Sequence, residues 1–354
     1  MKEENKAQNK IDLETIGWNS FFKESFSQYK NQEFIPGRIT QVQRKNCIAF
    51  TEIGEINAKV SGKFRFNASE KGSYPAVGDW VAIKKDPKND VGLIQAVLPR
   101  KSKISRKVIG KITQEQVIVA NVDIIWIVVG LDNDFSIERI ERYLTLVSES
   151  GANPVIILNK SDLCTDINKK IEEVRNLSPD VPIHELSAEL NQGLNILNQY
   201  LVKSQTIALV GSSGAGKSTI INKLLGIDRQ KVGAVRESDS RGRHITTYRE
   251  MIIFPTGGII IDNPGMKEIQ LWFKGKDLAD TFKDIEDIAL SCKFTNCNHK
   301  TEPGCAVKSS LESGDLNTRR YQHYLTLNKE AEKLAIRQEQ LKKKNAKQPQ
   351  PKRF

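Results

Sequence analysis

Residues 211–218 have the types and spacing of a phosphate-binding loop. Gly211 and Gly216 flank four residues, Lys217 and Ser218 follow, and an apolar run precedes the loop. In a strand–loop–helix of this kind, backbone N–H groups point at the phosphates, the lysine reaches the β- and γ-oxygens, and the serine binds Mg²⁺. We also count Lys217 among the catalytic residues. The predicted nucleotide contacts in this segment are Gly211, Ser212, Ser213, Gly214, Ala215, Gly216, Lys217, Ser218 and Thr219.

A second motif, Asn159-Lys160-x-Asp162, follows an apolar run and carries a carboxylate suited to guanine. Asp162 would accept hydrogen bonds from the ring N–H and the exocyclic amine of guanine, which adenine does not present in that arrangement. Leaving such a buried partner unpaired on the wrong base costs about 1–3 kcal/mol. Ser187 and Ala188, after another short apolar run, match a weaker motif whose backbone supports the base. Together these residues predict GTP rather than ATP.

The third motif, Asp262-Asn263-Pro264-Gly265, ends the apolar run at 258–261. This position places a carboxylate at the carboxyl end of a predicted strand, where Asp262 can meet Mg²⁺ through water. The amide of Gly265 could then bind the γ-phosphate. In isolation, Asn-Pro-Gly would be only a turn.

The polar segment at 237–247 is predicted to be a switch loop. We expect Thr246, with Thr247 as second choice, to complete the Mg²⁺ shell only when the γ-phosphate is present. Many small GTPases orient the attacking water with a glutamine after the third motif, but here that position is Met266. His244 is the nearest titratable substitute, and we predict that it orients or deprotonates the water. The alternative is a surface histidine that contacts RNA.

A cluster of metal-binding side chains lies near the carboxyl terminus. Three thiols and one imidazole within fourteen residues are the ligand set of a closed, structural Zn²⁺ site. The predicted zinc ligands are Cys292, Cys297, His299 and Cys305. The other two cysteines, Cys47 and Cys164, are distant and are interpreted as core or incidental residues.

The composition of the chain indicates a polyanionic partner and gives no sign of a membrane protein. Lys and Arg number 54 against 43 Asp and Glu, so the formal net charge of +11 favours a polyanion such as nucleic acid. The basic stretches at 100–107 and 342–353 could contribute, although each could also be a solvated charge run. No apolar run is long enough to span a bilayer, and the amino terminus has no signal-peptide pattern, so we expect a cytoplasmic protein without a membrane partner.

The apolar pattern changes along the chain and predicts a multidomain protein. Short alternating runs indicate a small β-barrel or sandwich, and alternating strand and helix patterns then indicate a parallel sheet covered by helices. One of the predicted helices spans 191–202. The predicted domains are a helical extension at 1–33, a β-rich domain at 34–102, an α/β nucleotide-binding domain at 103–275, a mostly helical zinc-binding domain at 276–341 and a basic disordered tail at 342–354.

The order of the motifs is unusual, because Asn159-Lys160-x-Asp162 comes before the phosphate loop. With this order, the β-rich domain before it and the zinc cluster after it, the chain closely resembles the bacterial ribosome small-subunit-dependent GTPase A family, which is circularly permuted. The switch-loop pattern of that family, Gly-x-His-Thr-Thr-Thr, corresponds here to residues 242–247, with Ile245 in place of the first threonine.

The resemblance implies that residues 34–102 form an OB-fold. It also implies that the chain binds the small ribosomal subunit and its 16S rRNA, and that it acts in late maturation near the decoding region. GTP would be hydrolysed to GDP and phosphate, with turnover stimulated by the subunit and followed by release. We expect a monomer. The alternative function is an RNA-binding assembly scaffold in which GTP is only a regulatory ligand.

Overall fold

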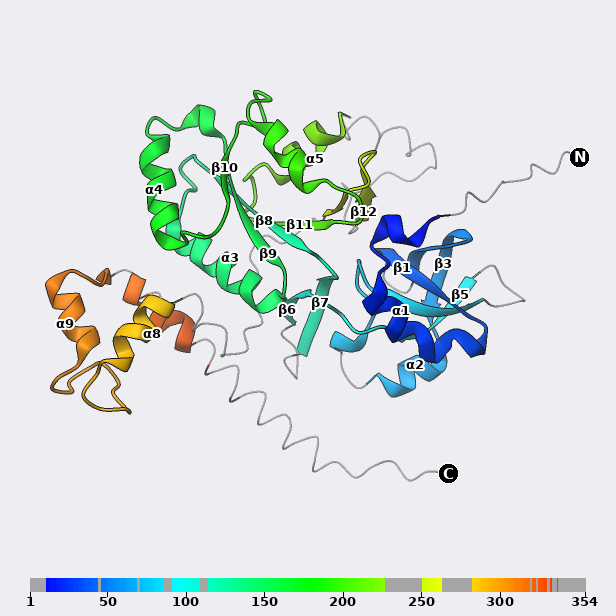
Figure 1. The fold of residues 1–354 in the computed structure, drawn as a ribbon, viewed down its shortest axis with the longest axis horizontal. Coiled ribbons are helices and arrows are strands. Elements are labelled where there is room, and N and C mark those ends of the chain that lie inside the picture. Colours follow the sequence, from blue (N-terminus) through cyan, green and yellow to red (C-terminus); the bar gives the residue numbers. More distant parts are fainter. Residues whose placement is uncertain are drawn as a thin grey trace, which may run out of the picture.

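A computed structural model describes residues 11–43, 46–68, 71–85, 91–108, 114–226, 250–262 and 282–329, the last range without 319 and 323, together with 332 and 336. The OB-type barrel lies at one end of the molecule, the C-terminal helices lie at the other end, and an α/β domain lies between them (Figure 1). In the described part of the chain, no helix is long and apolar enough to cross a membrane.

The amino-terminal segment packs onto the barrel through aromatic rings. It comprises η1 (Leu13–Ile16), α1 (Ser20–Phe26) and η2 (Ser27–Gln32). Trp18 lies at the centre of this contact, with its ring centroid 4.6 Å from that of the buried Trp80 in the barrel. These helices therefore cover one side of the barrel.

Five strands form the barrel: β1 (Phe34–Val42), β2 (Cys47–Thr51), β3 (Gly54–Val60), β4 (Trp80–Lys85) and β5 (Val91–Val97). They pair in the order β1-β2-β3-β5-β4, and β4 returns to β1, so the barrel closes. The β3–β5 pair is parallel and the others are antiparallel. A short helix, α2 (Gly62–Asn67), and the turn η3 (Lys71–Ser73) connect β3 to β4. This is the five-stranded topology of an OB-fold, as predicted.

A two-stranded hairpin, β6 (Lys103–Val108) and β7 (Gln114–Ala120), follows the barrel and leads into the central sheet. The strands of that sheet are β8 (Ile124–Gly130), β9 (Asn153–Asn159), β10 (Ile183–Glu185), β11 (Thr206–Val210), β12 (Glu250–Ile253) and β13 (Ile259–Asp262). Their order is β10-β9-β8-β11-β13-β12, and all pairs except β12–β13 are parallel.

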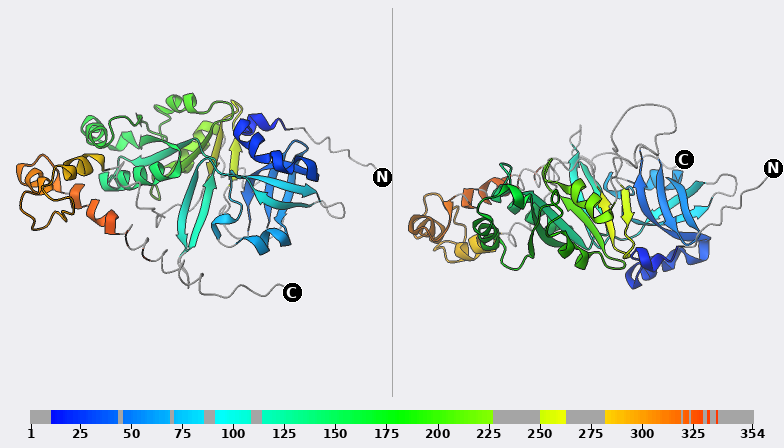
Figure 2. Two further views of the ribbon diagram at one scale, coloured as in Figure 1. Left: turned by 60° about the horizontal axis from the view of Figure 1, so that its bottom comes forward. Right: turned by 90° about the horizontal axis from the view of Figure 1, so that it is seen from above.

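Helices cover both faces of the central sheet (Figure 2). On one face, α3 (Ile137–Ser150) and α4 (Ile167–Leu177) pack against β8 and β9. On the other face lie η5 (Leu194–Tyr200) and α5 (Lys217–Leu225). All residues of β8 are buried, which is why its sequence is apolar throughout rather than alternating.

The barrel and the central domain are joined by strand pairing and by a buried arginine. Gln41 of β1 pairs with Glu250 of β12, so the two sheets are continuous. Arg38, also in β1, is 1% exposed and donates hydrogen bonds to Asn121 O at 3.0 Å and to Thr206 Oγ1 at 2.9 Å. Burial lowers the pKa of this guanidinium to about 10.

The C-terminal module contains α8 (Lys283–Leu290) and α9 (Ala306–Ser313) and packs on α3. Arg320 joins the two parts, since it pairs with Asp284 of α8 at 2.7 Å and with the buried Glu141 of α3. The predicted fold class, an OB-type barrel followed by an α/β domain and a mostly helical C-terminal region, is confirmed.

Candidate functional site

The predicted nucleotide motifs meet at one edge of the central sheet. The phosphate loop follows β11, the guanine motif begins at the end of β9, and Asp262 ends β13. These strands and β8 are parallel neighbours, so their carboxyl ends lie along the same edge. In open α/β sheets, ligands bind outside the carboxyl ends of the strands.

Positive backbone φ angles shape the phosphate loop at Gly211 (150°), Gly214 (83°) and Gly216 (95°). A Cβ atom at position 211 would lie 2.1 Å from Val128 O, and one at position 216 would lie 2.1 Å from Asn159 Nδ2. Only glycine fits at these two positions, because the loop approaches the end of β8 and the guanine motif so closely. Lys217 Nζ lies over the loop and donates to Gly211 O at 2.8 Å and to Ser212 O at 2.6 Å.

Asn159 connects two of the predicted motifs to each other. Its Nδ2 donates to Ala215 O in the phosphate loop at 2.8 Å, and its Oδ1 accepts from Ala188 N at 3.0 Å. The residue is 2% exposed, so these bonds are shielded from water. We predicted Asn159 as a nucleotide contact, and the structure adds that its amide fixes the distance between the loops.

Asp162 is exposed in η4 (Ser161–Leu163), and its carboxylate accepts a short hydrogen bond from the hydroxyl of Ser187. Ser187 is fully buried, and its hydroxyl also accepts from Leu190 N at 3.3 Å. The predicted guanine-binding carboxylate is thus oriented by the same segment, 187–188, that was expected to support the base.

Two carboxylates after β8 belong to this edge and were missed from the sequence. Asp132 pairs with Lys160 at 2.5 Å, and that hydrogen bond lowers the pKa of Asp132. Hydrogen bonds from Arg139 and then Ser212 lower the pKa of Asp134, which places this residue beside the phosphate loop. Their position directly after a fully apolar strand was the signal that could have identified them.

Several predicted site residues lie outside the part of the chain that the structure describes. They are His244, Thr246, Thr247 and Gly265. The predicted catalytic and Mg²⁺ roles of these residues therefore stay predictions. Asp262 is described as the last residue of β13, and its backbone pairs with Glu250.

The predicted zinc ligands come together between α8 and α9. The donor atoms of Cys292, Cys297, His299 and Cys305 all lie within 4.8 Å of one another. Cys292 Sγ is 3.5 Å from His299 Nδ1 and 3.9 Å from Cys305 Sγ, and the His299–Cys305 distance is 3.4 Å. Tetrahedral Zn²⁺ with bonds of about 2.3 Å to sulfur and 2.0 Å to nitrogen needs edges of roughly 3.5–3.8 Å. The cluster therefore fits a structural zinc ion.

The loop that carries His299 is held in shape by Glu302. Its carboxylate accepts from the backbone N–H groups of Asn298, Lys300 and Thr301 at 2.9–3.1 Å. Backbone hydrogen bonds lower the pKa of this carboxyl to about 2. His299 has a positive φ of 57°, which turns the chain within the ligand set. The loop is therefore folded by its own hydrogen bonds around the four donors.

The fold and the site define the class of this protein as a circularly permuted GTPase between an OB-type barrel and a helical module with a Cys₃His cluster. A model of the RsgA GTPase family matches residues 97–272. The chain is 40% identical over 329 residues to the Small ribosomal subunit biogenesis GTPase RsgA of Opitutus terrae, and the alignment covers 90% of each chain. It is 44% identical over 303 residues to RsgA 1 of Oceanobacillus iheyensis, with 85% of this chain and 86% of the relative covered. The chain belongs to the RsgA GTPase family.

Solved structures agree with this assignment. YjeQ from Thermotoga maritima superposes with a TM-score of 0.59 at 28% identity, covering 84% of this chain and 98% of the other. YloQ, described as a circularly permuted GTPase, gives a TM-score of 0.57 at 24% identity, covers 86% of this chain and 97% of its own, and supports the fold.

Proposed function

We propose that this GTPase acts in the late maturation of the small ribosomal subunit, binding the subunit with GTP and leaving it after hydrolysis to GDP and phosphate. The observation that carries the nucleotide part is the pair of hydrogen bonds made by Asn159, which holds the phosphate loop and residue 188 at a fixed separation. A nucleotide whose base and phosphates contact both segments binds without first having to order them.

In this proposal, residues 211–219 hold the phosphates, and Asn159, Lys160, Asp162 and residues 187–188 hold the guanine. The Lys160–Asp132 pair and the Ser187–Asp162 bond support the roles in the base site, because they orient the aliphatic stem of the lysine and the carboxylate before a base arrives.

Mg²⁺ would be held by Ser218, Asp262 and Thr246, and it would neutralise charge on the β- and γ-phosphates. His244 orients or deprotonates the attacking water, and Gly265 donates its amide to the γ-phosphate. The position of Asp262, at the edge where the phosphate loop begins, supports its part of this assignment.

The other domains supply the contacts to the subunit and its 16S rRNA. We assign the boundaries 1–33, 34–102, 103–275, 276–341 and 342–354 to the extension, barrel, GTPase domain, zinc-binding domain and tail. The chain acts as a cytoplasmic monomer, and Zn²⁺ has a structural role.

Substitution of Lys217 distinguishes the proposed GTPase switch from the alternative function, an RNA-binding scaffold. Lys217→Ala should abolish GTP turnover and subunit maturation, whereas Lys223→Ala, an exposed lysine on the same helix, should preserve both. If Lys217→Ala loses turnover but still supports maturation in cells, GTP is only a regulatory ligand and the scaffold alternative is correct.

A further inference from the structure

The connection between β3 and β4 exposes an aromatic ring among basic side chains. Phe66 on α2 is 88% exposed, although large apolar side chains are usually at least partly covered. Lys63, Arg65 and Lys71 are also exposed, and Tyr74 is 38% exposed. We call these five residues the α2 platform. Of the two acids in this connection, Glu70 lies outside the described residues and Asp79 is buried.

The helix turns Phe64 inward and Phe66 outward. Ser61 caps α2 by accepting from Phe64 N at 3.0 Å, and its hydroxyl bonds Gln95 of β5 at 3.0 Å. Phe64 lines a groove of about 810 Å³ between α2 and the end of α3. Phe66 follows Phe64 by two residues, which corresponds to a rotation of roughly 200° about the helix axis. Phe66 therefore lies on the opposite side of α2 from this groove.

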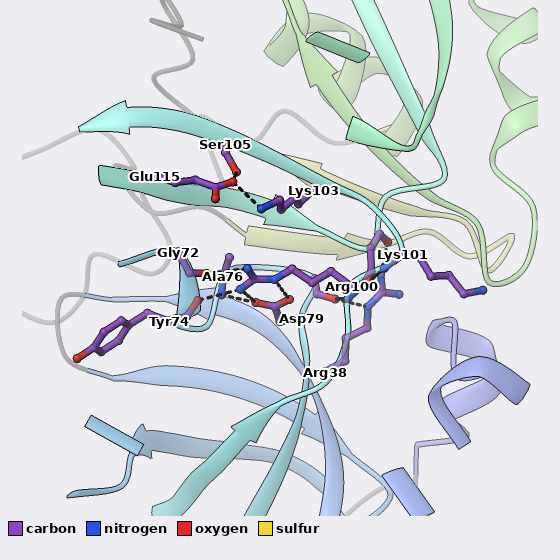
Figure 3. Close-up of polar contacts among 12 residues, drawn as sticks. Arg38, Gly72, Tyr74, Ala76, Asp79, Arg100, Lys101, Lys103, Ser105 and Glu115 are labelled. Atoms are coloured by element: carbon purple, nitrogen blue, oxygen red, sulfur yellow. Dashed lines mark hydrogen bonds and ion pairs between the residues drawn. The ribbon is translucent and has the colours of Figure 1, made fainter. Parts of the chain in front are cut away.

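A buried ion pair supports the platform from below (Figure 3). Arg100 binds both carboxylate oxygens of Asp79 at 2.7 Å, and it also donates to Gly72 O at 2.7 Å and Tyr74 O at 2.9 Å. Asp79 is fully buried. The ring of Tyr74 meets Phe64 edge to face, with centroids 5.7 Å apart. The Arg100–Asp79 ion pair therefore holds η3 and Tyr74 in place. The contact between Tyr74 and Phe64 in turn positions α2, the helix that carries Phe66.

Two charged side chains of the neighbouring hairpin neutralise each other. Lys103 pairs with Glu115 at 2.6 Å, and Ser105 also donates to Glu115 at 2.7 Å (Figure 3). The guanidinium of Arg100 is used by Asp79 and two carbonyls. The platform itself contributes three exposed cations that are close to Phe66 in the sequence, Lys63, Arg65 and Lys71.

We propose that the α2 platform binds an unpaired RNA nucleotide, with its base stacked on Phe66 and the adjacent phosphates bound by Lys63 and Arg65. A bare ring beside cations matches a base next to a phosphate, since any base offers a π-face and stacking needs no hydrogen-bond partner. An apolar pocket of a protein would have to bury or neutralise the same cations, which is costly. This inference rests on the proposed function, because the RNA that the platform binds is the RNA of the small ribosomal subunit.

Three substitutions of Phe66 test the stacking. Phe66→Ala and Phe66→Leu should raise the concentration of purified small subunits that gives half-maximal GTP turnover by roughly 5- to 150-fold, which is the range for one stacked base. Phe66→Trp should keep the wild-type value. Maximal turnover and turnover without subunits should stay unchanged in all three. If Leu preserves binding and Trp weakens it, the platform occupies an apolar protein pocket and the proposal is wrong.

The cations are tested by salt dependence. Plotting log K for subunit binding against log salt, Lys63→Ala/Arg65→Ala should reduce the slope by about 0.7 for each phosphate that the variant no longer binds. Lys169→Ala/Arg175→Ala, an exposed lysine–arginine pair on α4, is the matched control and should leave the slope as in the wild type. An unchanged slope in the platform variant would exclude binding of phosphates by Lys63 and Arg65.

A direct assay separates this inference from the function on which it rests. Fluorescence anisotropy with a single-stranded RNA of mixed sequence, about 12 nucleotides long, should show weaker binding for Phe66→Ala and wild-type binding for Phe66→Trp. If wild-type turnover does not respond to small subunits but this RNA result holds, the proposed function fails and the platform stands. If subunits stimulate turnover and all Phe66 variants behave as wild type in both assays, only the platform fails.

Discussion

Substituting Asn159 by aspartate changes one donor atom at the point where the nucleotide motifs meet. Asn159 Nδ2 lies 2.8 Å from Ala215 O, so an aspartate oxygen would face a carbonyl oxygen there, while the bond from Ala188 N could persist. A buried carbonyl without its donor costs about 1–3 kcal/mol, and more if the facing group is charged. If this cost destabilises the arrangement of the loops that binds the nucleotide, the affinity for the nucleotide drops by roughly 5- to 150-fold.

The pH dependence of this variant has a definite sign. Burial beside a carbonyl raises the pKa of the new carboxyl above its unfolded value of about 3.9, because both effects oppose the charged form. The protonated acid can donate to Ala215 O and imitate the amide. The site is therefore nearly intact at low pH, and its stability is lost as pH rises through the raised folded pKa.

The assay is the affinity for a fluorescent GDP analogue at about pH 7.5 and about pH 5.5, each relative to the wild type at the same pH. The Asn159→Asp defect should be large at the higher pH and smaller at the lower one. Asn153→Asp, at the exposed start of the same strand, is the control and should bind as the wild type does. Wild-type affinity for Asn159→Asp at both pH values would refute the role of this amide in holding the loops.

Three further predictions concern two ion pairs and the zinc site. Because Lys160 lowers the pKa of Asp132, their pair stabilises the fold above about pH 4 and is lost as pH falls through the lowered folded pKa. Asp132→Asn should thus cost about 0.2–1 kcal/mol near neutral pH and less in acid, by urea unfolding at the two pH values; an equal cost at both would contradict this. Arg320→Ala removes the guanidinium that pairs with the buried Glu141 and should lower the free energy of unfolding by about 3–5 kcal/mol. An unchanged midpoint of thermal unfolding would contradict this prediction. Removing zinc with a chelator should reduce hydrogen-exchange protection in α8 and α9 but not in the barrel, and reduced protection in both would argue against a local structural metal.

The sheet edge could be predicted from the sequence, because its motifs are local patterns attached to strands of recognisable period. Gly211, Gly216 and Lys217 need only their spacing and an apolar run before them. The link from Asn159 to Ala215 and Ala188 could not be predicted in this way. It joins residues 56 and 29 positions away, and no local pattern specifies such a contact.

The barrel junction shows the limit of interpreting charge from composition. Residues 100–107 were interpreted as a possible RNA contact, yet Arg100 is paired with the buried Asp79 and Lys103 with Glu115. Arg38 was not singled out, since arginine is almost never fully buried unless it is paired. Two of its acceptors are 83 and 168 residues away in the chain. A cation is recognised as structural only when its distant partners are known.

Two segments, one helical and one a hairpin, differed from the sequence expectation for local reasons. The helix predicted over 191–202 is the 3₁₀ segment η5 (Leu194–Tyr200), which follows Gly193 at a φ of 74°. Strands β6 and β7 were not predicted, because lysines, serine and arginine interrupt the apolar alternation of 103–108. Pairing between the two strands, which is not visible in either segment alone, stabilises the hairpin.

GTP turnover by the wild-type chain, measured with and without purified small ribosomal subunits over a series of salt concentrations, tests the proposed function most directly. We predict slow turnover alone, a sharp increase with subunits, and a half-saturating subunit concentration that rises with salt, because binding to phosphates releases counterions. Turnover that is the same with and without subunits, under conditions where GTP is bound, would contradict a subunit-dependent GTPase.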